Sequence, residues 1–538
     1  MGCGPERWGA LTPRPEGGEN RGRERTLRHM RSRAALLLII GAACAAPRVV
    51  ESPPYVAPNA AAPMSDPEEY RDRKISIAAG QDYFMRFGVG DPYSTGIAYP
   101  VLLALMQAYP DDLGRNWREF SSKLGFIAAI DPKTPPTGFH LTIDPNTRVP
   151  FVVMNCQLCH TDVLKLPAGD TIVAGIGSKR VRVHAYDAAL TRIGLDPELT
   201  VERLDDLATK AATERGVPWP YEMRRPILVA TLKEWRRRAA LRSADTKKLE
   251  RALPGRVATI ESFMMALNMQ RGTHLALPEK PGWTKIPDVR GFRYRETLSY
   301  DAVGTGAPSA LAAEADFAFG ARPVWYDTHR HIGTSLYLFL RAFDRKLPYP
   351  GNLDRDLASR GKTIFESRCA GCHGTYAGDA GNQRAAYQER VVPLAAIGTD
   401  DARLRAVTPE LVDAAKAVPI TKGLTHVEAT NGYVPPVLID LWARGLYGHA
   451  GQWPTLDVLA MKPEDRPRLF IVQADAPYDL ERIGSRWRAT SPQDGAPLAP
   501  GEYVWDASAP GCGVGGHPFL SDLPAHDRHA VLEYAKTL

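Results

Sequence analysis

The sequence predicts a mainly α-helical fold of two domains, with long irregular loops and a few short β-strands. The first reason is a pentapeptide, Cys-x-x-Cys-His, that occurs twice, at residues 156–160 and 369–373. The second is the pattern around each copy, where stretches of helical periodicity alternate with segments rich in proline and glycine. We therefore expect one domain around each copy, over residues 67–346 and 347–538.

The overall composition is that of an ordinary globular protein. The chain has 538 residues, of which 44% are hydrophobic, so it is long enough for two or three domains with substantial cores. The formal net charge is +6, but residues 1–33 alone hold eight Arg against four Glu. Because the rest of the chain is nearly neutral, no interaction with nucleic acid is expected.

Residues 1–44 predict a leader and an export signal. Arginines precede an apolar run at residues 34–43, and this run is too short to span a bilayer. Cleavage after Ala45 is one outcome, and conversion of Cys44 into a lipid anchor is the alternative. No other segment approaches the length of a membrane span, so we expect a periplasmic protein, soluble or tethered by a lipid, without a transmembrane helix in the mature chain.

The N-terminal domain is expected to combine helices with strands that flank the first pentapeptide. The strands are predicted from β-branched and aromatic residues on either side of the turn at residues 144–147. The expected elements are, in order, an Ala- and Pro-rich linker at 45–66, helices between 66 and 123, strands at 139–143, 149–154, 171–173 and 180–183, and helices at 198–214 and 225–253. Residues 277–325 are expected to be irregular.

The helix predicted at 225–253 carries a dense run of charge from Lys233 to Arg238. Such a run is typical of a solvated helix face. The alternative is a basic docking patch for a redox partner protein.

The second domain is expected to begin at the proline-rich segment 347–351. An amphipathic helix at 353–368 then leads directly into the second pentapeptide. The last predicted element is a helix at the C-terminus.

The spacing within the pentapeptide indicates covalently bound haem. Two thiols separated by two residues can each add to one vinyl group of a porphyrin, and the adjoining His can then ligate the iron. A zinc site would need four ligands, and a thioredoxin-like pair has no use for the His. We therefore predict two haem c groups, held by Cys156, Cys159, Cys369 and Cys372, with His160 and His373 as proximal iron ligands.

The sixth ligand of each iron decides what such a protein does, and spacing alone leaves it open. After the second pentapeptide the only Met is Met461, and the histidines are His426, His449, His517, His526 and His529. The last two flank the terminal helix and are expected on the surface. For the first haem, His184 and His140 are the candidates, although a structural role in the core is the simpler expectation for both.

The second domain resembles a class I cytochrome c. In that fold the first and last helices cross beside the haem, through a glycine and an aromatic residue on one helix and an aliphatic and an aromatic residue on the other. Gly361 and Phe365 match the first pair, and Val531 and Tyr534 match the second.

A larger part of the chain resembles the dihaem cytochrome c peroxidase and MauG superfamily, especially the rubber-oxygenase-like dihaem cytochromes. The resemblance rests on residues 431–442, 446–456, 464–467, 478–484 and 516–523, and it is weaker over 90–190. It implies His517 as the sixth ligand of the second haem, with Met461 as the runner-up, while His449 lies near the haems without binding iron.

The same resemblance implies that the first haem, bound through His160, is the reactive one. Its distal ligand is then weak or absent, and His184 could be a displaceable ligand. An aromatic residue between the haems is also implied, and four side chains lie in the right interval: Trp283, Tyr300, Trp325 and Tyr326. Cys512 has no assigned role and is expected to be a buried, inert thiol.

Two functional interpretations follow. In the first, the protein is an oxidoreductase whose first haem activates peroxide or dioxygen while the second transfers electrons. In the second, both irons are six-coordinate and the protein is a pure electron carrier. The partner is accordingly a small oxidant or a redox protein, and cleavage of a polymer is not expected because the chain is shorter than typical rubber oxygenases.

Overall fold

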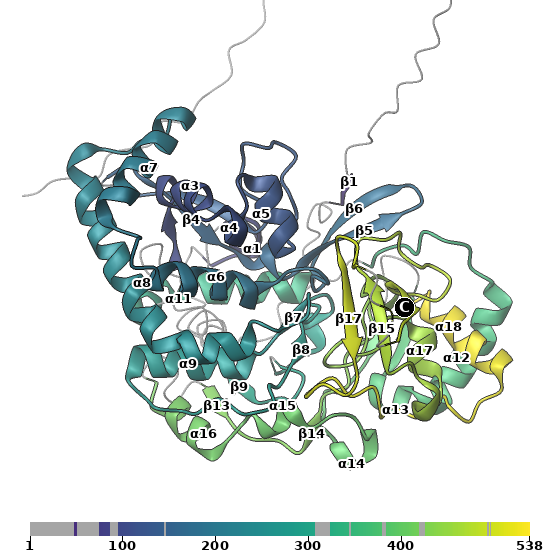
Figure 1. The fold of residues 1–538 in the computed structure, drawn as a ribbon. Coiled ribbons are helices and arrows are strands. Elements are labelled where there is room, and N and C mark those ends of the chain that lie inside the picture. Colours follow the sequence, from purple (N-terminus) through teal and green to yellow (C-terminus); the bar gives the residue numbers. More distant parts are fainter. Residues whose placement is uncertain are drawn as a thin grey trace, which may run out of the picture. The chain divides into compact units, whose positions relative to one another are not determined.

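Helices and strands both contribute substantially to the structure (Figure 1). The computed structural model describes residues 48–50, 75–86, 95–144, 147–297, 299–306, 323–343, 346–378, 384–418, 425–491, 494 and 497–538. All of them belong to one unit that spans residues 46–538. Helix accounts for 43% and strand for 15%, so the chain is mixed α/β, and the expectation of a mainly α fold overstated the helix. The leader and Cys44 lie outside the described residues.

The first helices build an apolar core before the first pentapeptide. They are α1 (Ile77–Met85), α3 (Tyr99–Ala108), α4 (Pro110–Leu113) and α5 (Trp117–Leu124). From Tyr99 to Met106 every side chain of α3 is buried. The Asn116 side chain accepts hydrogen bonds from the first amides of α5, and Gly125 ends that helix in the left-handed conformation.

Two small sheets flank the first pentapeptide. The first sheet is antiparallel and has the strand order β2 (Ile97–Ala98), β4 (Pro150–Met154), β3 (Phe139–Ile143). Its central strand, β4, is followed along the chain by the short helix η2 (Cys156–Leu158). The hairpin β5 (Thr161–Leu166) and β6 (Gly169–Ala174) follows, and β1 (Arg48–Val50) pairs with β6 in parallel. The strands predicted before the pentapeptide and at 171–173 are present.

The strand predicted at 180–183 is wrong. Arg180 lies in a loop, where its Nε atom is 2.7 Å from the buried carboxylate of Asp162. The helix α6 (Val183–Leu195) begins directly afterwards. Arg and Val alternate here because Arg180 forms an ion pair and Val181 is buried in the core, and not because the segment belongs to a sheet.

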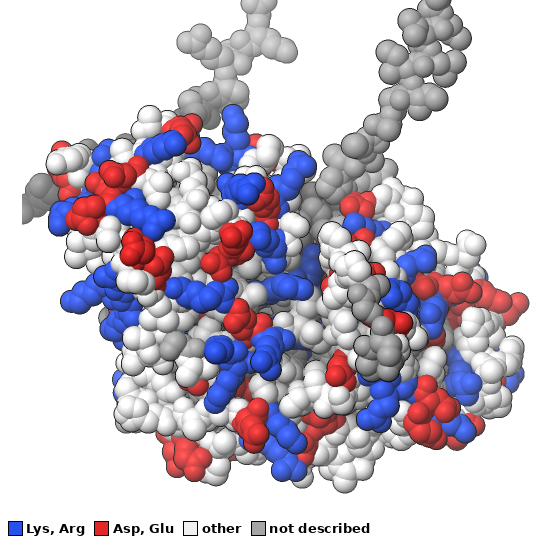
Figure 2. Space-filling model, viewed as in Figure 1, with Lys and Arg blue, Asp and Glu red and all other residues white. Residues whose placement is uncertain are grey.

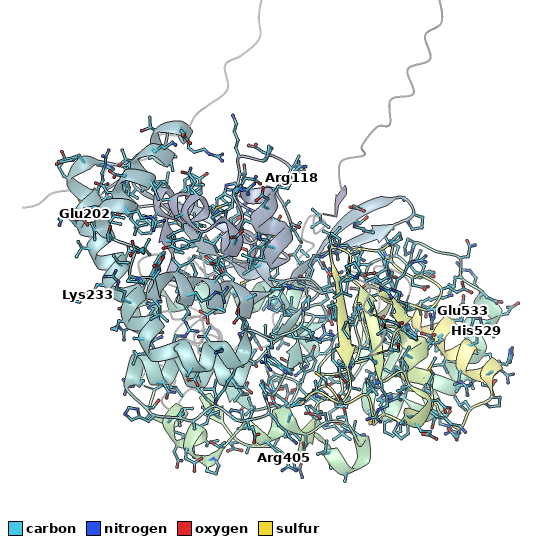
Figure 3. The ribbon with its side chains drawn as sticks, in the orientation of Figure 1. Arg118, Glu202, Lys233, Arg405, His529 and Glu533 are labelled. Atoms are coloured by element: carbon cyan, nitrogen blue, oxygen red, sulfur yellow. The ribbon has the colours of Figure 1, made fainter. Side chains whose placement is uncertain are left out.

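The middle of the chain is helical, and its charged run lies on the surface. The helices are α7 (Val201–Arg215), α8 (Tyr221–Leu249), α9 (Thr259–Arg271) and α11 (Pro323–Ala342). In α8, Glu234 is 2.7 Å from both Arg237 and Arg238. Positive and negative side chains are interspersed on the face shown in Figure 2, and Figure 3 shows Glu202 of α7 and Lys233 of α8 at the outer edge. A solvated face, as predicted, fits these contacts.

Between α9 and residue 306 the chain is largely irregular, as expected. The short elements here are β8 (Thr284–Lys285), which pairs with β7 (Arg256–Val257), η3 (Phe292–Tyr294) and β9 (Gly304–Gly306). Strand β9 pairs with β13 (Thr425–Val427), so the ladder joins segments on either side of the boundary predicted at residue 347. The division into domains stays a prediction.

The C-terminal part surrounds the second pentapeptide with short helices and strands. The helices are α12 (Arg355–Arg368), α13 (Ala370–His373), α14 (Leu394–Ile397), α15 (Ala402–Arg405), α16 (Pro409–Lys416), η4 (Leu441–Ala443), α17 (Leu456–Ala460), η5 (Pro463–Asp465) and α18 (Ala525–Ala535). The strand pairs are β10 (Thr375–Ala377) with β11 (Arg384–Ala386) and β12 (Val392–Pro393) with β14 (Gly432–Tyr433). A three-stranded sheet has the order β16 (Arg486–Ala489), β15 (Leu469–Gln473), β17 (Glu502–Asp506).

Helices α12 and α18 cross at the residues that the sequence indicated (Figure 1). The rings of Phe365 and Tyr534 are 5.2 Å apart. A Cβ atom added to Gly361 would lie 1.8 Å from the carbonyl oxygen of Ala530. Only glycine permits this close approach of the two backbones.

We predict that Gly361→Ala destabilises the protein. The added methyl group has no space, so α12 and α18 must separate, and overpacking of this kind costs about 1–3 kcal/mol. Urea unfolding should show that loss relative to the wild-type chain. Lys362→Ala is the control, since its side chain is 47% exposed on the same helix and its loss should change stability by less than about 0.5 kcal/mol. Equal stability of the two variants would contradict the crossing.

Candidate functional site

Both pentapeptides fold into one closed helical turn. The backbone N–H of His160 donates to the carbonyl of Cys156 over 2.9 Å, and that of His373 donates to Cys369 over the same distance. Each turn brings two thiols and one imidazole to the wall of a cavity. The closing hydrogen bond is thus the same at both sites, although the first turn contains a 3-10 helix at Cys156–Leu158 and the second an α-helix at Ala370–His373.

Each of the two imidazoles is oriented by a proline from a distant loop. His160 Nδ1 is 2.9 Å from the carbonyl oxygen of Pro287, and His373 Nδ1 is 2.8 Å from that of Pro436. A carbonyl only accepts, so Nδ1 carries the proton and Nε2 is left with a free lone pair. Burial lowers the pKa of both histidines, while the bond to the proline raises it. Both rings are therefore neutral at pH 7, as an imidazole must be to bind a metal.

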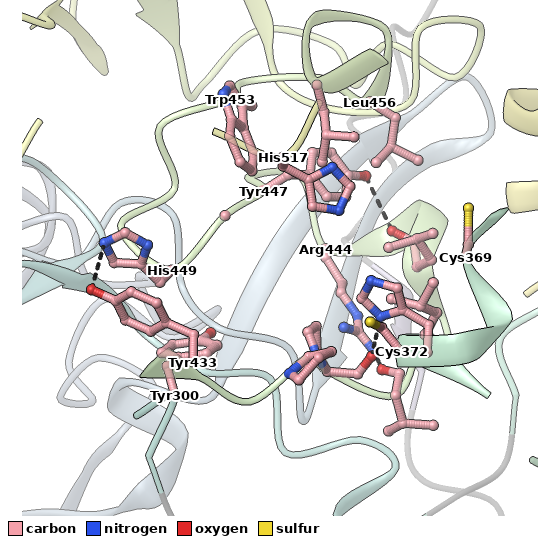
Figure 4. Close-up of a pocket in the computed structure, with 18 of the residues that line it drawn as sticks. Tyr300, Cys369, Cys372, Tyr433, Arg444, Tyr447, His449, Trp453, Leu456 and His517 are labelled. Atoms are coloured by element: carbon pink, nitrogen blue, oxygen red, sulfur yellow. Dashed lines mark hydrogen bonds between the residues drawn. The ribbon is translucent and has the colours of Figure 1, made fainter. Parts of the chain in front are cut away.

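A second imidazole faces His373 across its cavity, which has a volume of about 250 Å³. The ring of His517 lies 6.3 Å from the ring of His373, measured between centroids, at an interplanar angle of 51°. Figure 4 shows His517 and Trp453 on one side of this cavity and Cys372 on the other. Burial, and then the nearby His373 and Arg466, lower the pKa of His517 to about 3, so this ring is neutral as well.

The separation of these two rings fits one metal ion between them. A metal bound at about 2.0 Å to a nitrogen of each ring would separate the ring centres by about 6 Å. The Nδ1 atom of His517 is buried and has no hydrogen-bond partner among the described residues, so none of them holds the ring by a competing polar contact on that side. An iron in a porphyrin takes four ligands from the macrocycle, which leaves two axial positions for the protein.

The other histidines and Met461 lie elsewhere. Met461 caps α17 and does not line this cavity in the described part of the chain. His449 does line it, but its ring stacks on Tyr433 at 4.4 Å, and its Nε2 is 3.5 Å from the Tyr433 hydroxyl. His526 and His529 are exposed on α18, as predicted, and Figure 3 labels His529 there. The side chain of His426 lies outside the described residues.

The cavity beside the first pentapeptide is larger, about 560 Å³. His184 of α6 lines it, but its Nε2 accepts a hydrogen bond from the backbone N–H of Ala258 over 3.0 Å. Burial lowers the pKa of His184 to about 4. His140 lies on β3 and does not line the cavity. Among the described residues, no imidazole faces His160 as His517 faces His373.

Cationic side chains outnumber carboxylates at the second cavity. Its described walls include five cations, Lys285, Arg290, Arg295, Arg368 and Arg444. Of the described acidic residues, Asp288 alone lines it. Three of these cations have their own carboxylates: Arg290 with Asp440, Arg295 with Glu389 and Arg368 with Asp522. Lys285 and Arg444 share Asp288, at 2.7 and 3.7 Å, and the Nε atom of Arg444 has no hydrogen-bond partner in the part of the chain that the structure describes. An anionic group in this cavity would complete the pairing, as the propionates of a haem would.

The same charges connect the two proline loops. Asp288 follows Pro287 in the first loop and faces Arg444 of the second. In return, Arg290 of the first loop lies 2.5 Å from Asp440 of the second. Arg444 also donates to the carbonyls of Val437 and Ile439, beside Pro436. The two loops that orient the pentapeptide histidines are therefore joined by buried ion pairs.

Of the residues that the structure describes, five border both cavities: Pro287, Asp288, Phe292, Arg295 and Tyr300. Tyr300 is thus the member of the predicted aromatic set that separates the two sites. Trp283 instead packs edge-on against His184. The side chains of Trp325 and Tyr326 lie outside the described residues.

Burial raises the pKa of three described cysteines, Cys159, Cys369 and Cys512. Burial raises the pKa of Cys159 to about 12 and that of Cys369 to about 11, so neither is a thiolate at neutral pH. A thioredoxin-like pair needs the opposite. Cys512 is buried, and burial raises its pKa to about 11, which agrees with an inert thiol. No group of three or more His, Cys, Asp or Glu among the described residues forms a metal site without further ligands.

Sequence reasoning missed the supporting residues Pro287, Asp288, Pro436 and Arg444. A signal was present, because both loops contain a proline followed within nine residues by an aspartate and an Arg-Gly pair, at 287–291 and 436–445. Without a structure, nothing connects either loop to a pentapeptide that precedes it by 127 residues in one case and 63 in the other.

No family model matches this chain. It is 32% identical over 154 residues to the uncharacterized protein y4iM of Sinorhizobium fredii, covering 25% of this chain and 35% of that protein. It is 23% identical over 247 residues to y4iJ of the same organism, covering 35% and 40%. The chain thus spans well under half the length of these curated relatives.

A solved structure of hydrazine synthase from Kuenenia stuttgartiensis, pressurized with xenon, aligns with 50% of this chain and 79% of that chain. The identity is 17% and the TM-score 0.25, a likeness too low to establish a shared fold. In the described residues, no helix has the length and apolar character needed to cross a membrane.

We predict that acid destabilises the protein partly through His449. Burial lowers its pKa to about 4, against about 6.5 when unfolded, so the unfolded chain binds more protons between these values. Stability is therefore fully present above pH 6.5 and falls toward pH 4, by up to about 3 kcal/mol from this residue. His449→Phe keeps the stacking on Tyr433 and should flatten the pH dependence of urea unfolding. His529→Phe, on the exposed surface, is the control and should leave it unchanged.

Proposed function

We propose that this chain is an exported dihaem c-type redox protein in which the first haem reacts with peroxide or dioxygen and the second transfers electrons. The observation that carries the proposal is the difference between two otherwise equal sites. His517 faces His373 at a distance suited to a shared metal, whereas no described imidazole faces His160 in its larger cavity.

Haem at both sites is supported by the chain's own groups. Cys156 and Cys159, and likewise Cys369 and Cys372, would form the thioether bonds, and His160 and His373 would each bind iron through Nε2. Lys285 and Arg444 share one carboxylate, so a propionate would complete their pairing. The walls of both cavities are mainly apolar, which suits the flat, apolar ring of a porphyrin.

The axial ligands of each proposed haem would decide whether it only transfers electrons or also binds an oxidant. A haem with two imidazole ligands passes single electrons, whereas a haem with an open axial position also binds peroxide or dioxygen. His373 and His517 would close both faces of the second iron. His160 would hold the first iron from one face and leave the other accessible through the larger cavity.

Tyr300 lies between the sites and is our choice for the aromatic residue that links them. It borders both cavities, and its backbone carbonyl accepts a hydrogen bond from Val434, beside the second proline loop, over 2.7 Å. Burial raises the pKa of Tyr300, so its hydroxyl keeps its proton at neutral pH.

A pure electron carrier is the second candidate, and His184 is the observation that favours it. This imidazole borders the first cavity and is neutral, as a ligand must be. To bind iron through Nε2 it would have to release the N–H of Ala258. In either case the proposed setting is the periplasm, with a small oxidant or a redox protein as partner and Cys44 as a lipid anchor if it is retained.

We predict that the holoprotein carries two covalent haems per chain and that each cysteine pair holds one. Changing Cys156 and Cys159 to Ala together should leave one haem per chain, and so should changing Cys369 and Cys372. Haem content per protein, measured spectrophotometrically after export in a host that matures c-type cytochromes, tests this. Cys512→Ala is the control and should keep both. A wild-type chain without covalent haem would refute the proposal.

We further predict one high-spin and one low-spin ferric haem in the electron paramagnetic resonance spectrum. Cyanide should convert the high-spin signal, and His184→Ala should leave the spectrum unchanged. Under the carrier function, the wild type would instead show two low-spin haems inert to cyanide and peroxide, and His184→Ala would create a high-spin signal. These opposite results separate the two functions.

A further inference from the structure

Arg466 is a buried cation that forms no ion pair with a carboxylate of the described residues. Its side chain is 2% exposed, and the carboxylate of Glu464 acts on its charge only electrostatically, without an ion-pair contact. Burial lowers its pKa to about 10, so it keeps its charge at pH 7. A buried guanidinium needs other compensation, and here backbone carbonyls provide it.

The guanidinium of Arg466 binds five carbonyl oxygens on two segments. Nη1 donates to Val514 over 2.9 Å and to Gly516 over 2.6 Å, and Nη2 donates to His517 over 3.2 Å, to Leu459 over 2.9 Å and to Met461 over 3.2 Å. Its flat face covers the ring of Trp453 at 4.9 Å, and the Trp453 indole N–H donates to the Val514 carbonyl over 3.0 Å. One planar cation thus holds the loop before and at His517.

That loop needs such a support because its backbone is strained. Gly516 has a φ of 79° and His517 a φ of 50°, so two consecutive residues are left-handed, and the second is not glycine. This conformation brings the carbonyls of 514, 516 and 517 toward one point, where they would repel one another without a cation. The backbone N–H of His517 makes one further bond, to the carbonyl of Ile397 over 2.7 Å.

We propose that Arg466 is a positioning residue that holds His517 in place as the sixth ligand of the second haem. This inference rests on the proposed function. The same guanidinium also holds the carbonyl of Met461, but of the two candidates it is His517 that lines the cavity and faces His373. A planar fork is required, because a lysine has three donors on one nitrogen and cannot span carbonyls on two segments.

The test compares four variants of the ferric holoprotein. His517→Ala defines the spectrum without the ligand, Arg466→Lys removes the fork but keeps the charge, and Trp453→Phe removes the indole donor and weakens the stacking. Arg468→Lys is the matched control, because Arg468 lies two residues away and is exposed. The readouts are the low-spin signal of the second haem and the rate at which cyanide displaces its sixth ligand.

We expect displacement about tenfold faster or more in Arg466→Lys, with part of the low-spin signal lost, as for other groups that support metal ligands. Trp453→Phe should show a smaller acceleration, which keeps the inference testable if the lysine variant folds poorly. Added imidazole should restore the low-spin signal in His517→Ala and Arg466→Lys, which distinguishes ligand loss from unfolding. Arg468→Lys should match the wild type.

Two results would overturn the inference, and only the second of them also contradicts the proposed function. If His517→Ala loses the low-spin signal while Arg466→Lys and Trp453→Phe keep wild-type displacement rates, Arg466 has no positioning role and the proposed function stands. If His517→Ala leaves the signal unchanged, His517 is not the ligand, and that part of the proposed function fails together with the role of Arg466.

Discussion

A hydrogen bond from a histidine Nδ1–H to a prolyl carbonyl organises each half of the site. It fixes the tautomer and the orientation of the ring, so that Nε2 of His160 and of His373 is free for a metal. Both acceptors lie in loops, and loops shift unless other contacts hold them. Here the contacts are the buried pairs of Arg290 with Asp440 and of Arg444 with Asp288, each joining one loop to the other. Neither histidine can reorient without disturbing the support of its counterpart.

This arrangement determines which parts the sequence could predict. The pentapeptide forms a turn closed by a hydrogen bond between its first and its fifth residue, so this turn can be predicted from the pentapeptide alone. The crossing of α12 and α18 was also predicted, but from the resemblance to a class I cytochrome c. The structure places Gly361 against the carbonyl of Ala530 and the ring of Phe365 against that of Tyr534. The proline loops were not predicted, since Pro287 follows His160 by 127 residues and only tertiary structure joins them. The strand expected at 180–183 failed for the same reason, as the distant charge of Asp162 decides the place of Arg180.

The two sites also show why an identical motif does not define an identical function. Each pentapeptide contributes two thiols and one imidazole, and the difference comes from what packs on the opposite side. At the second site a strained loop presents His517, whereas at the first site the imidazole of His184 is engaged by the backbone of Ala258. If haem is bound as proposed, residues remote from the motif decide whether an axial position is closed, and the pentapeptide by itself does not distinguish the two sites.

The excess of cations at the second site adds an electrostatic argument. Lys285 and Arg444 share the carboxylate of Asp288, and a cation without a full partner is costly in a buried cavity. With haem bound as proposed, a propionate would relieve this cost, so retention of the cofactor and stability of the loops would support each other. Any positive charge left over would then favour the less positive, reduced state of the proposed iron. Because Asp288 also borders the first cavity and follows the proline that orients His160, the same three residues would influence both irons, and the two sites would not titrate as independent centres.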